Sequence, residues 1–571
     1  MATELISLGI LFLCAIIGGA IASRLRQPAV FGLLLVGALI GPNALNIVKD
    51  MSMIQIMAEF GAILILFIIG LEFDITKLVK LGVRSILIGL LKFLVVTFFG
   101  YQTMLLLGFS AGVALFTGVI LSFSSTIVVI KVLEQKEMFA RKEVPLLIAV
   151  LIIEDVIAVF TLTFFSGLSG ASTGMVATFE RIVFSITVLV FAYFIAMKLL
   201  KHAVAIFMRE NADDSFFTFL SLGVGALFSY FASYLGLTPS AGAFLAGSLI
   251  ASLPNAKEYG RAIHPYAMIF TSIFFISMGT LVDFNVIQQN GFLIIALLAA
   301  VLISRFLAIG TLTFFLANFR KEQPFFASIA MISVGEFSLL VAKESQKFDI
   351  GIDLVTISAA LIFVSALVMS FGLNYTSSIH SKFNSRVSSR SMSRFEGISN
   401  YMRTFFDQME IENFFTKKLR AESQVAFLLV IVALFSSIVL RRMLNFLNNG
   451  NPIALYSFYA FTVVIISYLG FLVFRKIKSI HYTMAVILTN VDSSRNIRKC
   501  TKILNNLMLS LFFMFLAMIA PFFIFMLNLS LWVNLLPFAF LIVSYYFARN
   551  MFNLIDSSFS NFNHSRTAVP F

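Results

Sequence analysis

The chain has 571 residues, of which 60% are hydrophobic and only 12% charged, and its mean hydropathy is +0.98. Soluble domains carry about 25% charged residues, so this composition excludes an ordinary soluble protein and indicates an all-α polytopic membrane protein. The net charge of +13 does not indicate binding to nucleic acid, because the basic residues form short clusters between apolar runs. Two cysteines and five histidines without clustered spacing argue against a disulfide framework, a zinc site or a haem site.

Apolar runs divide the first 376 residues into about 13 predicted membrane spans. They cover residues 3–23, 28–46, 54–72, 84–107, 111–133, 145–167, 181–200, 216–235, 238–253, 266–282, 291–316, 324–342 and 354–376. Basic residues gather in alternate turns, which by the positive-inside rule predicts an N-terminus outside and a C-terminus inside. The first run ends in small residues, as a signal peptide does. Glu4 stands where a basic region would be, which favours an uncleaved span.

Two adjacent carboxylates, Glu154 and Asp155, lie near the middle of the run 145–167, which holds no other charged residue. A charge at the centre of a spanning helix costs about 2.5–3.5 kcal/mol, and adjacent carboxylates repel each other. Such a pair indicates a site that holds a cation or a proton halfway across the membrane. The alternative is a structural lock onto another helix.

Two apolar runs contain polar breaks. The fifth run has four hydroxyl side chains within residues 122–126, and the twelfth has Gly335 followed by Glu336. The hydroxyls alone are compatible with bonds back to the preceding helical turn. However, the two breaks occupy corresponding positions in the triplets of runs 84–167 and 291–376, which enter the membrane from opposite sides. This pattern predicts an inverted repeat with a transport site between two broken helices.

Arg305 lies about midway along the run 291–316 and needs a partner at the same depth. The carboxylates predicted at that depth are Glu154, Asp155 and Glu336, and we expect Arg305 to pair with Glu154. Arg305 and Glu336 are thus predicted to be charge-compensating groups. Because an arginine keeps its proton in a protein, this pairing predicts that only Asp155 titrates and that exchange is electroneutral.

Glu72 ends the third run at the predicted cytoplasmic face. One interpretation is that it attracts cations into an inner funnel. The other is an ion pair with the following Lys77 or Lys80, and the sequence does not separate the two.

Six segments, in chain order, carry a family resemblance: AEFGAILILFIIGLEFD, LSFSSTIVVIKVLEQKEM, LIIEDVIAVF, PSAGAFLAGSLIAS, FFISMGTLVDF and SVGEFSLLV. Over roughly residues 1–376, the chain resembles the membrane domain of the Kef-like antiporters of the monovalent cation:proton antiporter-2 family, which share the NapA/NhaA fold. The resemblance implies a homodimer, two broken crossed helices, and exchange of Na⁺ or K⁺ for protons by alternating access.

The resemblance also implies roles for particular residues. Asp155 would bind the cation or the proton, and Arg305 would be the basic residue of the core. The hydroxyls of the broken helix would be those of Ser124, Ser125 and Thr126. Glu154 departs from the family, which usually has Gln before this aspartate, so the preference between Na⁺ and K⁺ and the stoichiometry stay open.

The chain is predicted to have three parts: an antiporter module over 1–376, a cytoplasmic linker with an amphipathic helix over 377–423, and a C-terminal membrane bundle over 424–571. The bundle contains about four apolar runs, near 424–440, 453–474, 503–527 and 529–548, with an inside loop over 475–502. Packing or oligomerisation is its expected role, with gating or partner sensing as the alternative. No G-x-G-x-x-G motif follows residue 376, so we expect no nucleotide-binding domain in this chain.

The predicted function is secondary antiport of a monovalent cation, Na⁺ or K⁺, against protons across the plasma membrane. The protein is expected not to be an enzyme and to need no cofactor besides the transported ions. We expect Asp155 to alternate between the two ions, because one desolvated carboxylate cannot hold both. The alternatives are a gated cation channel and a non-transporting membrane sensor or scaffold.

Overall fold

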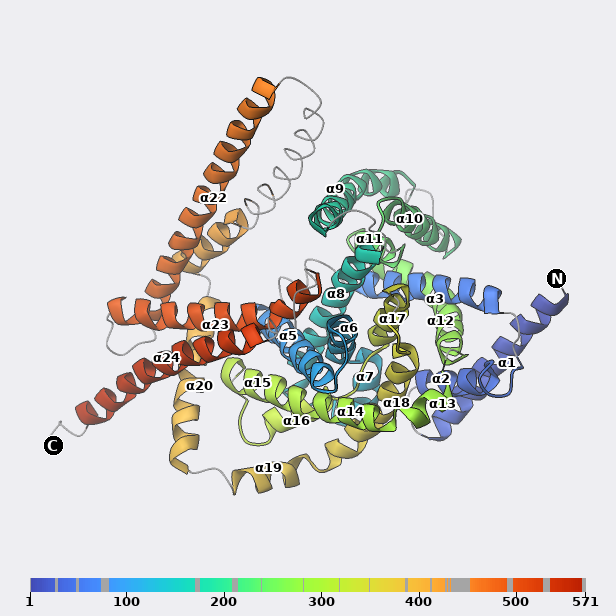
Figure 1. The fold of residues 1–571 in the computed structure, drawn as a ribbon, viewed down its shortest axis with the longest axis horizontal. Coiled ribbons are helices and arrows are strands. Elements are labelled where there is room, and N and C mark those ends of the chain that lie inside the picture. The colour runs from blue at the N-terminus through green and yellow to red at the C-terminus, as the bar shows by residue number, and fades with distance from the viewer. Residues whose placement is uncertain are drawn as a thin grey trace.

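The computed structural model describes residues 2–25, 29–47, 51–72, 82–169, 175–207, 214–237, 239–280, 282–317, 319–348, 350–385, 389–410, 413–426, 429, 432, 452–489, 497–526 and 535–566. In these residues all regular structure is helical, apart from one antiparallel bridge between Ser124 and Val334. Figure 1 shows helices α5 to α8 at the centre, with the N-terminal helices on one side and the C-terminal helices on the other.

A helix or a broken pair of helices lies in each of the 13 predicted runs of the module. The single helices are α1 (Ala2–Arg24), α2 (Ala29–Ile40), α3 (Met51–Glu72), α5 (Gly82–Leu106), α8 (Val144–Ser169), α9 (Met175–Phe207), α10 (Asp214–Tyr234), α11 (Pro239–Ala251), α12 (Ala256–Thr280) and α18 (Leu354–Asn374). Among the described residues of the whole chain, eight helices are long and apolar enough to cross a membrane, and five apolar helices are shorter. The membrane-protein class agrees with the sequence, and the number of spans stays a prediction.

Both predicted breaks are present, and they give the two halves of the module the same pattern. The first half contains α5, the broken pair α6 (Ala111–Ser122) and α7 (Thr126–Gln135), and α8. The second half contains α14 (Gly291–Arg305) continued by α15 (Thr311–Leu316), the broken pair α16 (Gln323–Ala330) and α17 (Glu336–Ser345), and α18. A short helix, α13 (Phe284–Gln289), precedes α14. A π-helical turn over Phe306–Gly310 directly follows Arg305, and such turns are frequent at functional sites.

Three clusters of buried apolar side chains hold these helices together. The largest joins the two broken pairs with α5, α8, α14 and α18, and extends to α2 and α12. A second cluster joins α3 with α9 to α12, and a third joins the C-terminal helices. The first cluster surrounds the breaks, so apolar packing encloses the polar groups that the breaks expose.

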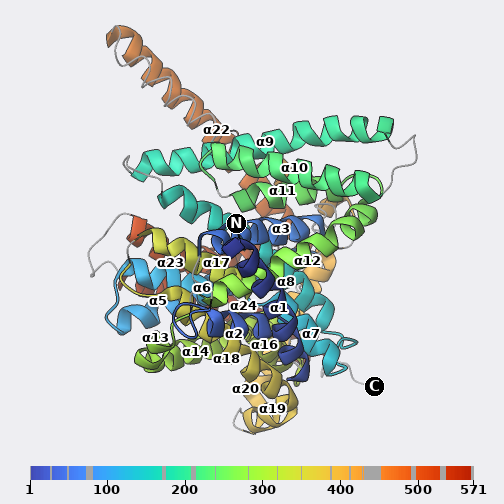
Figure 2. The ribbon, with the colours of Figure 1, turned by 90° about the vertical axis from the view of Figure 1, so that its right-hand side faces the viewer.

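The C-terminal part differs from the prediction in one respect, and one of its predicted runs is mostly untested. Its described helices are α19 (Thr376–Asn384), α20 (Ser389–Glu410), α22 (Pro452–Thr489), α23 (Ile497–Met526) and α24 (Leu536–Arg566). The predicted loop over 475–502 is wrong where the structure describes it, because α22 continues to Thr489 and α23 begins at Ile497. The C-terminal end of α22 packs in the third cluster, and its N-terminal part projects away from the other helices (Figures 1 and 2). Most of the predicted run 424–440 lies outside the described residues.

Helix α20 contains the start of the predicted amphipathic stretch, and its apolar side packs against protein. Tyr401, Phe405 and Phe406 are buried in the third cluster, which also contains residues of α22 to α24 and packs against Leu87 of α5 and Phe315 of α15. The Arg84 guanidinium of α5 also pairs with the carboxylate of Asp407. The helix therefore connects the C-terminal part to α5, which carries Lys92, and to α15, which continues the chain beyond Arg305.

Helices α5 and α6 approach each other closely at a glycine. A Cβ atom added at Gly118 would lie 2.3 Å from the carbonyl oxygen of Thr97. Real Cβ atoms do not come so near to a backbone atom, so an alanine here forces the two helices apart. By contrast, a Cβ at Gly223 of α10 meets no atom within 4 Å.

We predict that Gly118→Ala lowers the thermal unfolding midpoint of the purified protein, since overpacking a close contact costs about 1–3 kcal/mol. Gly223→Ala is the matched control and is expected to be neutral or slightly stabilising, because Ala favours helix by up to about 1 kcal/mol. Equal midpoints for the two variants would show that α5 and α6 are not in this close contact.

Candidate functional site

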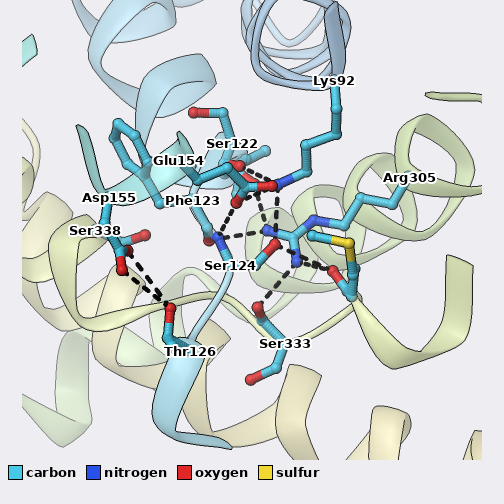
Figure 3. A network of polar contacts seen from close by, with 12 residues as sticks. Lys92, Ser122, Phe123, Ser124, Thr126, Glu154, Asp155, Arg305, Ser333 and Ser338 are labelled. Atoms are coloured by element: carbon cyan, nitrogen blue, oxygen red, sulfur yellow. Dashed lines mark hydrogen bonds and ion pairs between the residues drawn. The ribbon is translucent and has the colours of Figure 1, made fainter. Parts of the chain in front are cut away.

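Arg305 lies completely buried where the two broken pairs meet (Figure 3). Its Nη1 donates to the carbonyl oxygens of Met331 and Ser333 at the C-terminal end of α16. Its Nη2 donates to Leu121 at 2.8 Å and Phe123 at 2.9 Å, at the C-terminal end of α6. The planar guanidinium presents its donors as a rigid fork, so one side chain satisfies backbone carbonyls at both helix ends.

The backbones of the two breaks also contact each other directly. The amide of Ser125 donates to the carbonyl of Ser333 at 3.1 Å, and the amide of Gly335 donates to that of Phe123 at 3.0 Å. A Cβ at Gly335 would lie 2.5 Å from the carbonyl oxygen of Ser124. The position therefore has room only for glycine, which explains why Gly precedes the first residue of α17.

Lys92 of α5 pairs with Glu154 of α8 in the buried centre of the site. The Lys92 Nζ lies 2.8 Å from Glu154 Oε2, and the two residues are 0% and 1% exposed. The same ammonium donates to Ser124 Oγ at 2.9 Å and to the carbonyl of Ser122. Glu154 Oε2 also accepts the amide of Ser124 at 2.9 Å. Three acceptors match the three donors of a charged lysine.

The other two carboxylates lie at the N-terminal ends of the second half-helices. Asp155 is 8% exposed, and Thr126 Oγ1 lies 3.3 Å and 3.5 Å from its two oxygens. Glu336 is the first residue of α17, and its Oε2 accepts the hydroxyl of Ser125 at 2.9 Å. Ser125 also caps α7, where its hydroxyl accepts a backbone amide.

The charges of the site follow the dipoles of the four half-helices. Arg305 and Lys92 lie at C-terminal ends, where the backbone carries partial negative charge, and Glu336 and Asp155 lie at N-terminal ends, where it is positive. Each of these charges is stabilised by the helix end that it faces. The arrangement concentrates both kinds of charge at one depth of the protein.

Most of the residues predicted from the sequence meet at this crossing. Asp155, Glu154, Arg305 and Glu336 all lie within it, as do the hydroxyl residues Ser124, Ser125 and Thr126. Helix α3 ends at Glu72, but the side chain of that residue lies outside the described part of the chain, so its predicted role in an inner funnel is not tested.

The predicted pairing of Arg305 with Glu154 is wrong. The partner of Glu154 is Lys92, and the hydrogen bonds of the Arg305 side chain go to backbone carbonyls. Unwinding each broken helix leaves carbonyls without partners, and Arg305 supplies the donors that they need. The signal for Lys92 is present in the sequence, since it is the only charged residue of the apolar run 84–107 beyond Arg84 at its start.

Two discontinuous helices that cross around buried charges are the arrangement of secondary transporters. The model of the family described as "Sodium/hydrogen exchanger, transmembrane" matches residues 9–377. The chain belongs to this family, which confirms the resemblance drawn from its segments.

Three known proteins illustrate the likeness. The chain is 28% identical over 373 residues to a protein of Paramagnetospirillum magneticum named iron transporter MagA, covering 65% of this chain and 84% of that one. It is 25% identical over 345 residues to K(+) efflux antiporter 5 of Arabidopsis thaliana, covering 60% of this chain and 61% of that one. The solved sodium proton antiporter MjNhaP1 of Methanocaldococcus jannaschii has the same fold, with a TM-score of 0.52 and 16% identity over 66% of this chain and 99% of its own.

We predict strong coupling between Lys92 and Glu154 in a double-mutant cycle of thermal stability. Lys92→Met or Glu154→Gln alone leaves a buried group without its partner and is expected to cost about 3–5 kcal/mol. The double variant removes both charges and is expected to cost less than the sum. The cycle is measured by thermal unfolding in detergent, and additive losses would show that the two residues act independently.

Proposed function

We propose that this protein is a secondary active antiporter that exchanges Na⁺ or K⁺ for protons by alternating access, with Asp155 as the exchange site. The observation that carries the proposal is the placement of Asp155 at the crossing. Its carboxylate contacts the Thr126 hydroxyl at an N-terminal helix end and keeps a small exposed fraction, whereas Glu154 is held by Lys92.

The chemistry of this position suits the exchange of one ion for another. A carboxylate, a hydroxyl and the carbonyls of an unwound segment are oxygen ligands that replace part of a cation's hydration shell. A proton that binds Asp155 removes the negative charge that attracts the cation, so the two ions compete for the same group. Such competition at one site couples their opposite fluxes.

The donor set favours a monovalent cation over iron, although one relative is named an iron transporter. In the described part of the chain, no group of three or more His, Cys, Asp or Glu side chains is placed to hold a metal ion. Iron is usually held by such nitrogen, oxygen and sulfur ligands. A relative from Enterococcus hirae is named a Na(+)/H(+) antiporter, and the Arabidopsis relative is named a K(+) efflux antiporter.

The proposal also covers the oligomeric state, the location and the orientation of the protein. We infer a homodimer in the plasma membrane from the family resemblance. The basic turns predict that its N-terminus lies outside and its C-terminus inside. The contacts of α20 with α5 and α15 favour a structural role for the C-terminal part, which would fix the ends of these two helices.

We predict that Asp155→Asn abolishes exchange in proteoliposomes that contain a pH-sensitive dye. The amide binds a cation weakly and cannot be neutralised by a proton, so the competition is lost. Asp214→Asn is the matched control, since this exposed aspartate of α10 lies away from the crossing, and it is expected to transport as wild type.

Three results would contradict this proposal. Substantial cation-driven proton flux in Asp155→Asn would place the exchange site elsewhere. Cation flux in wild type without any linked change of pH would identify a channel, and the absence of flux would favour a sensor or scaffold.

We also predict exchange of one cation for one proton. The sequence based this expectation on a pair between Arg305 and Glu154, but in the structure Lys92 is the partner of Glu154. The three donors of the Lys92 ammonium are all occupied, so we expect Glu154 to stay ionised during the cycle. Asp155 would then be the group that binds and releases a proton during the cycle. The measurement is the reversal potential in proteoliposomes clamped with an ionophore, and a two-to-one balance would show that a second group releases a proton.

A further inference from the structure

Five buried ionisable side chains surround the crossing of the broken helices. Two are cationic, Lys92 and Arg305, and three are carboxylates, Glu154, Asp155 and Glu336. With all five ionised, these side chains leave a net charge of one negative unit. That is the charge that a single monovalent cation neutralises.

Lys92 determines this balance through its position as well as its charge. Its ammonium lies 2.8 Å from Glu154 Oε2, while Glu154 Oε1 is buried without a hydrogen-bond partner among the described residues. Because Glu154 and Asp155 are consecutive in α8, their Cα atoms are about 3.8 Å apart. Both side chains also contact the segment of residues 124–126. The ammonium therefore neutralises a second carboxylate next to the exchange site.

We propose that Lys92 restricts the transported ion to monovalent cations, an inference that rests on the proposed antiport at Asp155. Without Lys92, the charge of Glu154 is uncompensated beside the exchange site, and Glu154 Oε2 loses the ammonium that donates to it. Hard divalent cations prefer such carboxylate-rich sites. The added negative charge attracts a divalent cation twice as strongly as a monovalent one, so the selectivity between them changes.

Arg305 does not substitute for Lys92 in this role. Its guanidinium donates to four backbone carbonyls, and no carboxylate of the described residues accepts a hydrogen bond from it. Its position is determined by the ends of α6 and α16. Lys92 is thus the cation whose removal changes the carboxylate pair and leaves the contacts of the broken helices with Arg305 in place.

The experiment compares wild type with Lys92→Met, Lys92→Arg and the charge-balanced double variant Lys92→Met/Glu154→Gln. Each protein is purified and reconstituted in liposomes with an entrapped pH dye. Proton flux driven by NaCl or KCl gives the apparent KM for the monovalent cation, and MnCl₂ is the divalent competitor. Lys198→Met removes an exposed lysine of α9 and serves as the matched control, with wild-type behaviour expected.

The readout is the ratio of the inhibitory Mn²⁺ concentration to the KM for Na⁺ or K⁺, which a loss of folded protein does not change. Lys92→Met is expected to lower this ratio at least about tenfold, because the site gains one negative charge. Lys92→Arg keeps the positive charge and is expected to keep the ratio, whatever its turnover. The double variant restores the net charge and is also expected to keep the wild-type ratio.

An unchanged ratio in Lys92→Met would overturn the proposal. If Lys92→Met does not fold, the ratio measured for the double variant tests the proposal. A wild-type ratio there supports control by net charge, and a ratio shifted towards Mn²⁺ contradicts it. The wild-type arm tests the underlying antiport separately, since a failure of wild type to exchange Na⁺ or K⁺ for protons would contradict the proposed function itself.

Discussion

The architecture of the site depends on the hydrogen bonds from Arg305 to the carbonyl ends of two broken helices. Interrupting a helix inside an apolar protein leaves backbone groups that have no water to bind, and each such group costs several kcal/mol. Four carbonyls, at the end of α6 and in the two breaks, accept from this one side chain. Both breaks persist because a single buried guanidinium serves them together.

This constraint places the other charges. The two N-terminal half-helix ends, at α7 and α17, face the same region, and they stabilise the carboxylates of Asp155 and Glu336. Lys92 reaches the site from α5 and holds Glu154 together with an amide of the first break. Binding of a cation or a proton then changes the charge of a site whose backbone is already fixed.

Much of this arrangement could be predicted from the sequence, because its strongest signals are violations of membrane chemistry. Polar and charged residues interrupt four apolar runs, and these residues meet in space. They are the paired acids of one run, the hydroxyls of a second, Gly335 and Glu336 of a third, and Arg305 of a fourth. The pairing of these groups was harder to predict. Depth along a helix is readable from the sequence, but the direction of a side chain depends on how the helices pack. The sequence therefore predicts that Arg305 and Glu154 belong to the site, but it does not show that Arg305 faces backbone carbonyls.

The C-terminal part was predicted less well for a related reason. Its composition suggests apolar runs separated by basic loops, yet α22 continues through Arg475 and Lys478 because charged residues are good helix formers. Its aromatic residues, such as Phe405, pack against the module, and the sequence does not reveal the partner of an aromatic face.

The most direct test of the account is to locate the transported ion. The purified protein is to be crystallised with Tl⁺ in place of K⁺ or Na⁺, and the anomalous density measured in wild type and in Asp155→Asn. We predict a peak beside the Asp155 carboxylate and the Thr126 hydroxyl that is lost in the variant. A peak beside Glu336 instead, or one that persists in Asp155→Asn, would contradict the assignment of Asp155 as the exchange site.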